Sequence, residues 1–475
     1  MPSKTLPFIG VSNFRGTTST ADQYYSGCYL DKVDNAALQQ STYYVKGMKA
    51  FTASTSPTGP TSGAGTAILA WIGTGLSTPT ATSDIVTAYG NTNSTIYLND
   101  TSLGSITGQA LHMAETSIGG TPNVTIVSSG NRGYYYPNAG ALTEITDVDF
   151  PPKQTPALTI SGNFIHMNGK AYIMCTTGQI FESDVNSLVN WTTNAYLTAQ
   201  DSPDPGVGLA KVGRMVLAFG KTTIEFFQDT GNPAGSTLSR IDVKAIPSGV
   251  LNQHCILEAM NSVVWVGATG PQGPGVYVLE GYSAKKISNQ SIDQMITPYS
   301  TNDLRLNKHV TTGHEFIFFT FDVGSISWMY DVKNNHWTIW PLLSPDFQKS
   351  SIGFKNGAAT TFVISALTGT YRYEGSTYNE VNIVTSRFNA GTNNMKIWNS
   401  LRLVGDFSGS PAVNVSWSDD DYANFSTERS LTTTNPGTLL TRLGNSRERA
   451  FKFRYTPTQG TRFESIILEY DIAEQ

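Results

Sequence analysis

The side chains best suited to binding a metal or transferring a proton are six histidines: His112, His166, His254, His309, His314 and His336. No two of them have the spacing of an HExxH motif, and none is flanked by carboxylates at metal-ligand spacing. His309 and His314 lie on either side of Thr311-Thr312-Gly313, so we expect a turn between them. Histidines in this pattern are typical of polar residues at strand ends. The sequence therefore predicts no metal site and no catalytic histidine.

One acidic run, Ser418-Asp419-Asp420-Asp421, follows a strand-like segment. Clustered carboxylates suit Ca²⁺, but the run lacks the alternating ligands and the distal Glu of an EF-hand. A hairpin turn in which aspartates cap backbone amides is the alternative that we favour. The run is also close to the Asp-rich hairpin of propeller glycosidases, although the arginines and carboxylate pair of such an enzyme cannot be assigned.

Two glycine-rich stretches, Gly206–Gly208 and Gly270–Gly275, could suggest a phosphate cradle. Such a cradle needs a strand before it and a helix N-terminus after it, and neither stretch has this context. No Walker lysine follows a glycine run, and no Gly-x-Ser-x-Gly elbow is present. We expect both stretches to be loops, and we predict no catalytic residue, no cofactor and no enzymatic activity.

The three cysteines, Cys28, Cys175 and Cys255, are far apart and odd in number. This pattern predicts buried thiols in a reducing compartment and not a disulfide framework. The N-terminus lacks a signal-peptide pattern, and no run approaches 18 apolar residues. We therefore expect no membrane span, and synthesis in a cytoplasm.

Composition favours an all-β protein. The chain has 475 residues with 39% hydrophobic and 11% aromatic residues, so it can form a large core. Only 14% are charged, and their place is taken by the Thr, Ser, Asn and Gly of turns and exposed strand faces. The net charge of −5 without basic clusters argues against a sequence-specific DNA binder. It suits a surface that nucleic acid passes without sticking.

A β-hairpin pattern recurs about every 40 to 50 residues, each time as an apolar run, a turn and a second apolar run. The anchors of the series are Val86, Val124, Tyr172, Val216, Val264, Phe316 and Phe362. This spacing is typical of β-propeller blades, and it predicts six or seven blades over residues 84–379. A large sandwich or a β-helix could produce part of the same pattern. Five tryptophans in or after these hairpins are expected to pack between sheets (Trp191, Trp265, Trp328, Trp337 and Trp340), with stacking on sugars or bases as the alternative.

Two segments fall outside the repeat. Residues 1–83 are rich in Thr, Ser, Gly and Pro, and we expect an extended strap with a loop at Ser54–Gly65 and a strand at Ala67–Ile72 that enters the first blade. Residues 380–475 should form a C-terminal β unit. Four segments there alternate apolar and polar residues: Leu401–Val404, Val413–Trp417, Ala450–Tyr455 and Ser465–Tyr470.

This layout resembles the tail hub (nozzle) proteins of short-tailed phages, also called packaged-DNA stabilisation proteins. The resemblance is carried by Val413–Asp421 and Thr441–Tyr455, and at the N-terminus by Cys28–Val33 and Tyr43–Lys49, where Lys46-Gly47 replaces a more usual Pro-Gly. It implies a structural protein of the virion tail, assembled in the host cytoplasm, and no catalytic residue. Six identical subunits would form a tube below the portal and adaptor ring.

The same resemblance implies that the tube retains packaged double-stranded DNA and conducts it, without sequence specificity, during ejection. Tail spikes or fibres would attach outside, and a distal plug or needle would close the channel. A propeller glycosidase or lectin is the main alternative. A receptor-binding tail fibre subunit, usually trimeric, is the second.

Overall fold

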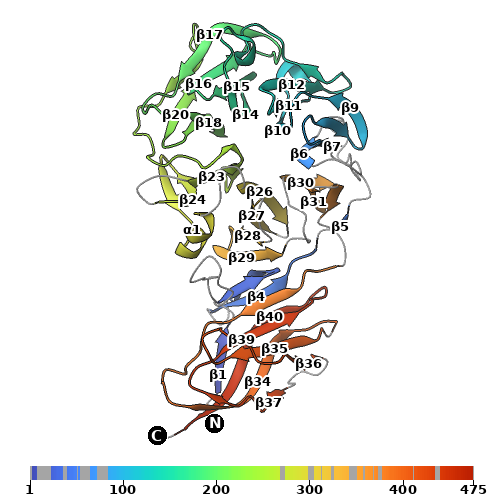
Figure 1. The fold of residues 1–475 in the computed structure, drawn as a ribbon, viewed down its shortest axis with the longest axis vertical. Helices are drawn as coiled ribbons and strands as arrows, with labels where there is room; N and C mark the ends of the chain where they lie inside the picture. Colours follow the sequence, from blue (N-terminus) through green and yellow to red (C-terminus); the bar gives the residue numbers. More distant parts are fainter. Residues whose placement is uncertain are drawn as a thin grey trace. The chain divides into compact units, whose positions relative to one another are not determined.

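The computed structural model describes most of the chain: residues 3–7, 23–35, 40–50, 52–53, 65–71, 84–267, 273–297, 304–311, 313–321, 326–341, 350–356, 359–366, 369–372, 377–409, 411–433 and 439–473. Among the described residues, the regular secondary structure is nearly all β-strand, with one short α-helix (Figure 1). Most of the predicted loop Ser54–Gly65 and part of Gly270–Gly275 lie outside them.

The chain divides into two compact units that do not follow the expected three-part division at residues 83 and 379. The propeller unit consists of Thr52–Gly324 and Ser344–Arg372, and the sandwich unit of Met1–Phe51, Ser325–Leu343 and Tyr373–Gln475. The N-terminal region divides between the two units. Its strands within residues 3–47 pair in the sandwich unit, whereas the strands at residues 52–53 and 65–71 pair in the propeller unit.

Four-stranded antiparallel sheets in chain order form the first three blades of the propeller unit. Blade 1 consists of β6 (Gly65–Trp71), β7 (Asp84–Tyr89), β8 (Thr95–Leu98) and β9 (Thr101–Ser105). Blade 2 consists of β10 (Ala110–Thr116), β11 (Asn123–Ser128), β12 (Arg132–Pro137) and β13 (Thr143–Glu144), with η2 (Ile118–Gly120) between β10 and β11. After η3 (Pro151–Lys153), blade 3 consists of β14 (Ile160–Met167), β15 (Lys170–Cys175), β16 (Gln179–Ser183) and β17 (Trp191–Thr198).

The remaining sheets of this unit repeat the pattern. Blade 4 consists of β18 (Gly206–Val212), β19 (Met215–Gly220), β20 (Ile224–Asp229) and β21 (Leu238–Arg240). Blade 5 follows η4 (Gln253–Cys255) and consists of β22 (Ile256–Ala259), β23 (Ser262–Gly267), β24 (Gly275–Glu280) and β25 (Ser283–Lys286), before helix α1 (Gln290–Ile296). Blade 6 supplies β26 (Leu304–Thr311) and β27 (His314–Phe321) to this unit. Blade 7 consists of β30 (Ser350–Asn356), β31 (Ala359–Ala366), β32 (Gly369–Arg372) and β5 (Thr52–Ala53).

The first strands of these blades form a ring. Within the described residues, seven inner strands lie next to one another in the order β6, β10, β14, β18, β22, β26 and β30, and β30 lies next to β6 again (Figure 1). The predicted β-propeller is confirmed, with seven blades. Pairing of Tyr371 with Ala53 closes the ring, because the outer strand of blade 7 comes from the chain before blade 1. The hydroxyls of Tyr89 and Thr370, 2.7 Å apart, add a hydrogen bond between blades 1 and 7.

Apolar side chains fill the spaces between neighbouring blades. Val127 and Phe150 lie in one buried cluster with Phe164, Ile173 and Trp191, so blades 2 and 3 share a core. A sheet has two faces, and stacking around a ring buries both. Each fully buried side chain of this size contributes about 1.5–3 kcal/mol. This explains why the hairpins show apolar residues at successive positions on both faces.

The sandwich unit contains two sheets. The first consists of β1 (Ser3–Pro7), β3 (Cys28–Asn35), β4 (Gln40–Gly47), β34 (Lys396–Asp406), β37 (Leu439–Thr441), β38 (Asn445–Ser446) and β40 (Arg462–Ile472). The second, within this unit, consists of β2 (Tyr24–Ser26), β28 (Ile326–Asp331), β29 (His336–Pro341), β33 (Val381–Val384), β35 (Val413–Ser418), β36 (Arg429–Leu431) and β39 (Ala450–Tyr455).

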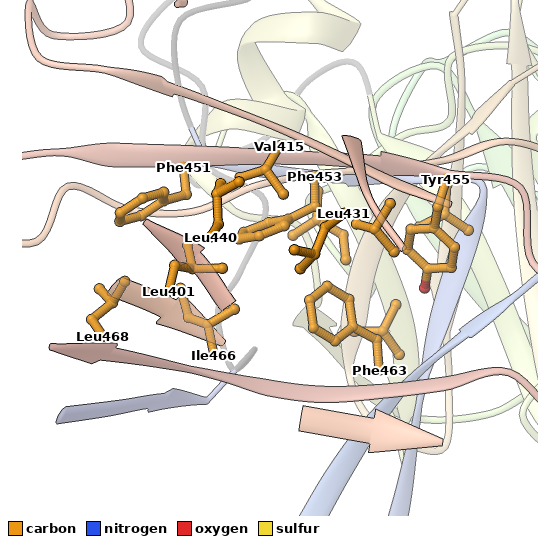
Figure 2. Close-up of a cluster of buried hydrophobic side chains, with 14 of the residues drawn as sticks. Leu401, Val415, Leu431, Leu440, Phe451, Phe453, Tyr455, Phe463, Ile466 and Leu468 are labelled. Atoms are coloured by element: carbon orange, nitrogen blue, oxygen red, sulfur yellow. The ribbon is translucent and has the colours of Figure 1, made fainter. Parts of the chain in front are cut away.

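Aromatic residues dominate the core between these sheets. Phe451, Phe453 and Tyr455 occupy alternate positions of β39 and face Phe463 and Ile466 of β40 (Figure 2). The ring centroids of Phe453 and Phe463 are 5.4 Å apart in an edge-to-face arrangement, which is the favoured geometry of aromatic pairs. The predicted C-terminal strands are confirmed, and their period-two pattern reflects one packed face.

Candidate functional site in the axial cavity of the propeller

A cavity of ≈ 380 Å³ lies inside the ring of inner strands. Residues of β6, β10, β14, β18, β22 and β26 line it, together with Gln253 and His254 of η4. All of these residues belong to the propeller unit. Central cavities of this size, with a few convergent polar groups, are where ligands bind in most proteins.

The short segment η4 reaches from blade 5 to the inner strands of other blades. The Asn252 side chain accepts a hydrogen bond from the His254 backbone N–H (2.7 Å) and donates one to the Leu304 carbonyl (3.1 Å). With the turn fixed in this way, the Gln253 Oε1 accepts a hydrogen bond from Gly162 N–H of β14 (3.0 Å). The His254 ring stacks on the His112 ring of β10, with centroids 4.7 Å apart.

Arg305 of β26 completes this group of side chains. Its Nη1 lies 3.5 Å from Nδ1 of His254. Burial, and then the positive charge of Arg305, lower the pKa of His112 to about 4, although hydrogen bonding to Gln253 acts in the opposite direction. The buried Nε2 of His112 has no hydrogen-bond partner within the described part of the chain. At neutral pH the His112 ring is therefore uncharged and Arg305 is a cation beside it.

Farther along the inner strands, positive and negative groups are interleaved. The Lys211 backbone N–H donates to Oε1 of Glu258 (3.2 Å), and the Lys211 Nζ donates to the His166 carbonyl (2.9 Å). The Lys308 Nζ donates to the Glu258 carbonyl (2.9 Å). Burial, and then the charge of Lys211, lower the pKa of His166 to about 3. Glu115 of β10 also lines the cavity.

Four inner strands carry a β-bulge near their first residues. The register shifts between Gly65 and Ala67, Ala110 and His112, Ser161 and Ile165, and Gly206 and Gly208. Bulges redirect side chains and are frequent beside functional sites. At Gly162, with φ +76°, a Cβ would lie 2.5 Å from the Gly208 Cα, so only glycine permits this approach of β14 to β18.

The prediction that Gly206–Gly208 is a loop is wrong. Both glycines lie in β18, which is a strand and not a turn. At Gly206 a Cβ would lie 2.4 Å from the Cys175 carbonyl oxygen.

Comparison with known proteins identifies the family. A family described as "Bacteriophage P22 Gp10, beta-propeller" matches residues 87–366, which run from blade 1 to blade 7. The chain belongs to this family. The resemblance to phage tail hub proteins is confirmed, and family membership gives the chain a structural role in the tail of a short-tailed phage.

Individual relatives are distant. The chain is 25% identical to the tail hub protein gp10 of Salmonella phage P22 over 113 residues, which are 23% of this chain and 24% of that protein. The match thus spans about a quarter of the length of this curated relative. A solved structure of BBS1N in complex with ARL6DN has a TM-score of 0.40 and 10% identity, covering 69% of this chain and 98% of that one. A solved structure of Raptor from Chaetomium thermophilum has a TM-score of 0.42 and 9% identity. The match covers 74% of this chain and 29% of that one.

The histidines of this family member occupy different environments. His309 and His314 flank a turn, as predicted, but both are buried, and the His309 ring stacks on Phe316 and Phe318. Burial lowers the pKa of His309 to about 3. The structure brings His112 and His254 together although 141 residues separate them in the sequence, and no motif marks either one. Sequence reasoning therefore missed this pair and Arg305.

The acidic run Ser418–Asp421 forms the predicted turn. Asp420 accepts hydrogen bonds from the Ser418 hydroxyl (2.8 Å) and the Asn424 backbone N–H (3.0 Å). The Asp419 carboxylate binds Arg449, and Asp421 lies 3.2 Å from Arg387. The carboxylates are thus directed at protein groups. Within the residues described, no group of three or more His, Cys, Asp or Glu is placed to hold a metal ion.

The predicted packing roles of Trp and Cys are confirmed. The tryptophans expected between sheets are all buried: Trp191, Trp265, Trp328, Trp337 and Trp340. Cys28, Cys175 and Cys255 are free and buried, and burial raises the pKa of the latter two to about 12. Across the described ranges, no helix is both long and apolar enough to cross a membrane.

Proposed function

We propose that this chain is the tail hub of a short-tailed phage. Six copies form a tube below the portal and adaptor ring, which retains the packaged double-stranded DNA and conducts it during ejection. Spikes or fibres attach to the outside of the tube, and a distal plug or needle closes it. The protein acts in the virion tail after assembly in the host cytoplasm, without enzymatic activity.

The family match over residues 87–366 is the observation that carries this proposal. The architecture supports it, because a closed propeller exposes few strand edges and makes a stiff module for ring assembly. A ring of identical chains needs head-to-tail contacts between two different surfaces, which two differently built units can provide. A net charge of −5 favours passage of DNA over retention by basic groups.

Mass measurement tests the proposal. We expect native mass spectrometry of the full chain, alone and with its adaptor, to show a complex with the adaptor that contains six copies of this chain. A count of six copies in purified virions is the second expected result. A count of three would favour the tail fibre subunit instead.

The glycosidase alternative makes a different prediction. Glu115 and Glu258 are the carboxylates that line the axial cavity, so they are the groups to change. Hydrolysis of a glycan by a persistent monomer, lost in E115Q or E258Q, would overturn the tail hub proposal. We expect no hydrolysis by the wild-type chain.

A further inference from the structure

We propose that a basic patch on the sandwich unit binds an acidic patch on the propeller unit of a second copy of this chain. The inference rests on the proposed function, because it names the two surfaces through which successive copies of the ring make contact. The basic patch consists of Ile397, Arg402, Arg429, Leu439, Arg442 and Arg447. The acidic patch consists of Asp147, Val148, Asp149, Asp184, Val185 and Val189.

Charge is distributed unevenly along the chain. Residues 84–199, which form most of blades 1 to 3, contain eight Asp or Glu and three Lys or Arg. Residues 429–447 of the sandwich unit contain three Arg and no other charged residue. The chain therefore has one region of each sign, and opposite charges favour and orient contact between copies.

The arginines of the basic patch bind no carboxylate. The Arg429 Nη1 donates a hydrogen bond to the Arg442 carbonyl (3.2 Å), and the Arg447 Nη1 donates one to the Asn393 carbonyl (3.1 Å). None of the four arginines of the patch, Arg402 included, forms an ion pair with a residue that the structure describes. Their guanidinium groups keep N–H donors for a partner.

The carboxylates near the basic patch do not neutralise it. Glu448 binds Arg387 (2.6 Å), which lies outside the patch. Glu469 and Asp471 of β40 accept hydrogen bonds from uncharged side chains of β34 (2.7 and 2.8 Å). The four arginines thus outnumber the two carboxylates that border them, and positive charge remains at this surface.

Two exposed apolar side chains lie among these arginines. Leu439 of β37 pairs with Arg402 of β34, and Ile397 of β34 pairs with Asn445 of β38. Directly paired residues of antiparallel strands lie on the same face of a sheet. Leu439 and Ile397 are each 49% exposed. Apolar side chains rimmed by charge are typical of a contact with protein, whereas contact with DNA phosphates needs cations alone.

The acidic patch lies where the segment Asp147–Asp149 meets β17. The carboxylates of Asp147, Asp184 and Asp149 accept hydrogen bonds from three successive residues of β17, Trp191–Thr193 (3.2, 2.6 and 2.5 Å). None of the three carboxylates forms an ion pair within the described part of the chain. The three Lys and Arg of residues 84–199 bind other carboxylates. This surface therefore offers three negative charges side by side.

Exposed valines accompany these carboxylates. Val148 and Val185 are 74% and 62% exposed, more than any other large apolar side chain among the described residues. A hydrogen bond from the Asp184 N–H to the Asn190 carbonyl (2.9 Å) closes the loop that carries Val185 and Val189. The acidic patch thus has the composition of the basic patch with the opposite charge. Carboxylates match guanidinium groups, and the apolar side chains can be buried against one another.

Contact between these patches is heterologous, because each copy contributes a different surface to each of its two neighbours. Head-to-tail contacts of this kind are the ones that build a closed ring from identical chains. The proposed six-copy tube therefore needs no further type of contact between neighbouring copies.

Charge reversal in the full-length chain, alone and with its adaptor, tests this contact. Arg442→Glu with Arg447→Glu reverses the basic patch, and Asp147→Lys with Asp184→Lys reverses the acidic patch. In native mass spectrometry each variant by itself should lose the six-copy complex, because association weakens at least about tenfold. An equal mixture of the two variants should restore the complex with equal numbers of both, since the reversed patches attract each other.

Matched variants separate the contact from general effects. Arg214→Glu with Lys244→Glu changes the net charge as much as reversal of the basic patch does, at two exposed positions of blade 4, and should leave assembly unchanged. Val148→Ser should weaken association about threefold or more. Val310→Ser, at a position that is 47% exposed in blade 6, should have no effect.

The outcomes distinguish this inference from the proposed function. Assembly of six copies by wild type and equally by both reversed variants would overturn this contact and leave the tail hub proposal standing. A wild-type chain that stays monomeric even with its adaptor would overturn the ring and this contact together. Folded variants that lose assembly without recovering it in the mixture would also overturn the contact. Loss of duplex DNA binding in the Arg442–Arg447 variant, with unchanged assembly, would assign the basic patch to DNA instead.

Discussion

The Arg449 guanidinium binds the Asp419 carboxylate through two parallel hydrogen bonds, both 2.7 Å long. The Arg449 side chain is only 1% exposed, and the Trp398 and Trp417 rings lie 5.3 and 5.1 Å from it. This ion pair explains the presence of Asp419 in the acidic run Ser418–Asp421. Asp419 neutralises a cation that the fold has taken out of water, and it ties the turn after β35 to the start of β39.

Asp419→Asn should therefore destabilise the sandwich unit strongly. The variant leaves a buried guanidinium without its counter-charge, and we expect a loss of about 2–4 kcal/mol, since Asp419 itself is partly exposed. Urea unfolding followed by tryptophan fluorescence measures the change. Asp421→Asn is the control, because its contact with Arg387 is solvent-accessible and should be worth less than about 1 kcal/mol. Equal effects of the two variants would contradict this role of Asp419.

In the propeller unit, we expect the buried carboxylate of Glu182 to have the stabilising role that the Arg449–Asp419 pair has in the sandwich unit. Its side chain is 1% exposed, lies 2.6 Å from the Lys170 Nζ, and accepts hydrogen bonds from Ser236 and Thr237 of blade 4. Glu182→Ala removes these contacts between blades 3 and 4 and should cost about 2–4 kcal/mol in thermal unfolding. The exposed pair Glu280–Lys285 is the comparison, and Glu280→Ala should cost less than about 0.5 kcal/mol. A Glu182→Ala variant as stable as Glu280→Ala would show that Glu182 does not stabilise the contact between blades 3 and 4.

The repeated hairpins could be predicted from sequence because each uses only local information. A few residues are enough to show the apolar–polar alternation of a strand. They are also enough to show a turn such as Asn168-Gly169, where both residues have positive φ. The number of blades could not be fixed in the same way. Blade 7 takes its outer strand from Thr52–Ala53, which pair with Tyr371 and Arg372 from the far end of the unit, and no local pattern encodes that partner.

The axial site could not be predicted for a related reason. His112, His254 and Arg305 come from blades 2, 5 and 6, and only ring closure brings the first strands of those blades around one axis. The acidic run drew attention in the sequence because its charges are adjacent, yet its carboxylates serve a turn and ion pairs. Residues adjacent in the sequence therefore have structural roles here, whereas the candidate site is made of residues that only the fold brings together.

Gly162→Ala should distort the wall of this site. The substitution adds a Cβ 2.5 Å from the Gly208 Cα, so the backbone of β14 or β18 must shift. It also places a residue with a Cβ at a φ of +76°, which strains the backbone. We expect a loss of about 3 kcal/mol or more in thermal unfolding. Gly213→Ala is the matched control in blade 4, since its φ is +59° and its Cβ would meet nothing within 4 Å. It should cost only about 1 kcal/mol, and an equal cost for both would show that close packing does not matter.

Stability of the propeller unit should fall as the solution becomes acidic through pH 6.5. His112 has a pKa of about 4 when folded and an ordinary value of 6.5, so the unfolded chain binds the proton more readily between these values. The contribution of neutral His112 is complete above pH 6.5 and is lost progressively as the pH falls towards 4. His166 and His309, with pKa values of about 3, act in the same direction.

Thermal unfolding of wild type and His112→Gln at several pH values measures this dependence. Because the His112 side chain is only half-buried, we expect the variant to recover about 1–2 kcal/mol of the stability that wild type loses between pH 7 and pH 4.5. Parallel pH profiles for the two proteins would mean that His112 does not titrate at the low pKa that its burial and Arg305 impose.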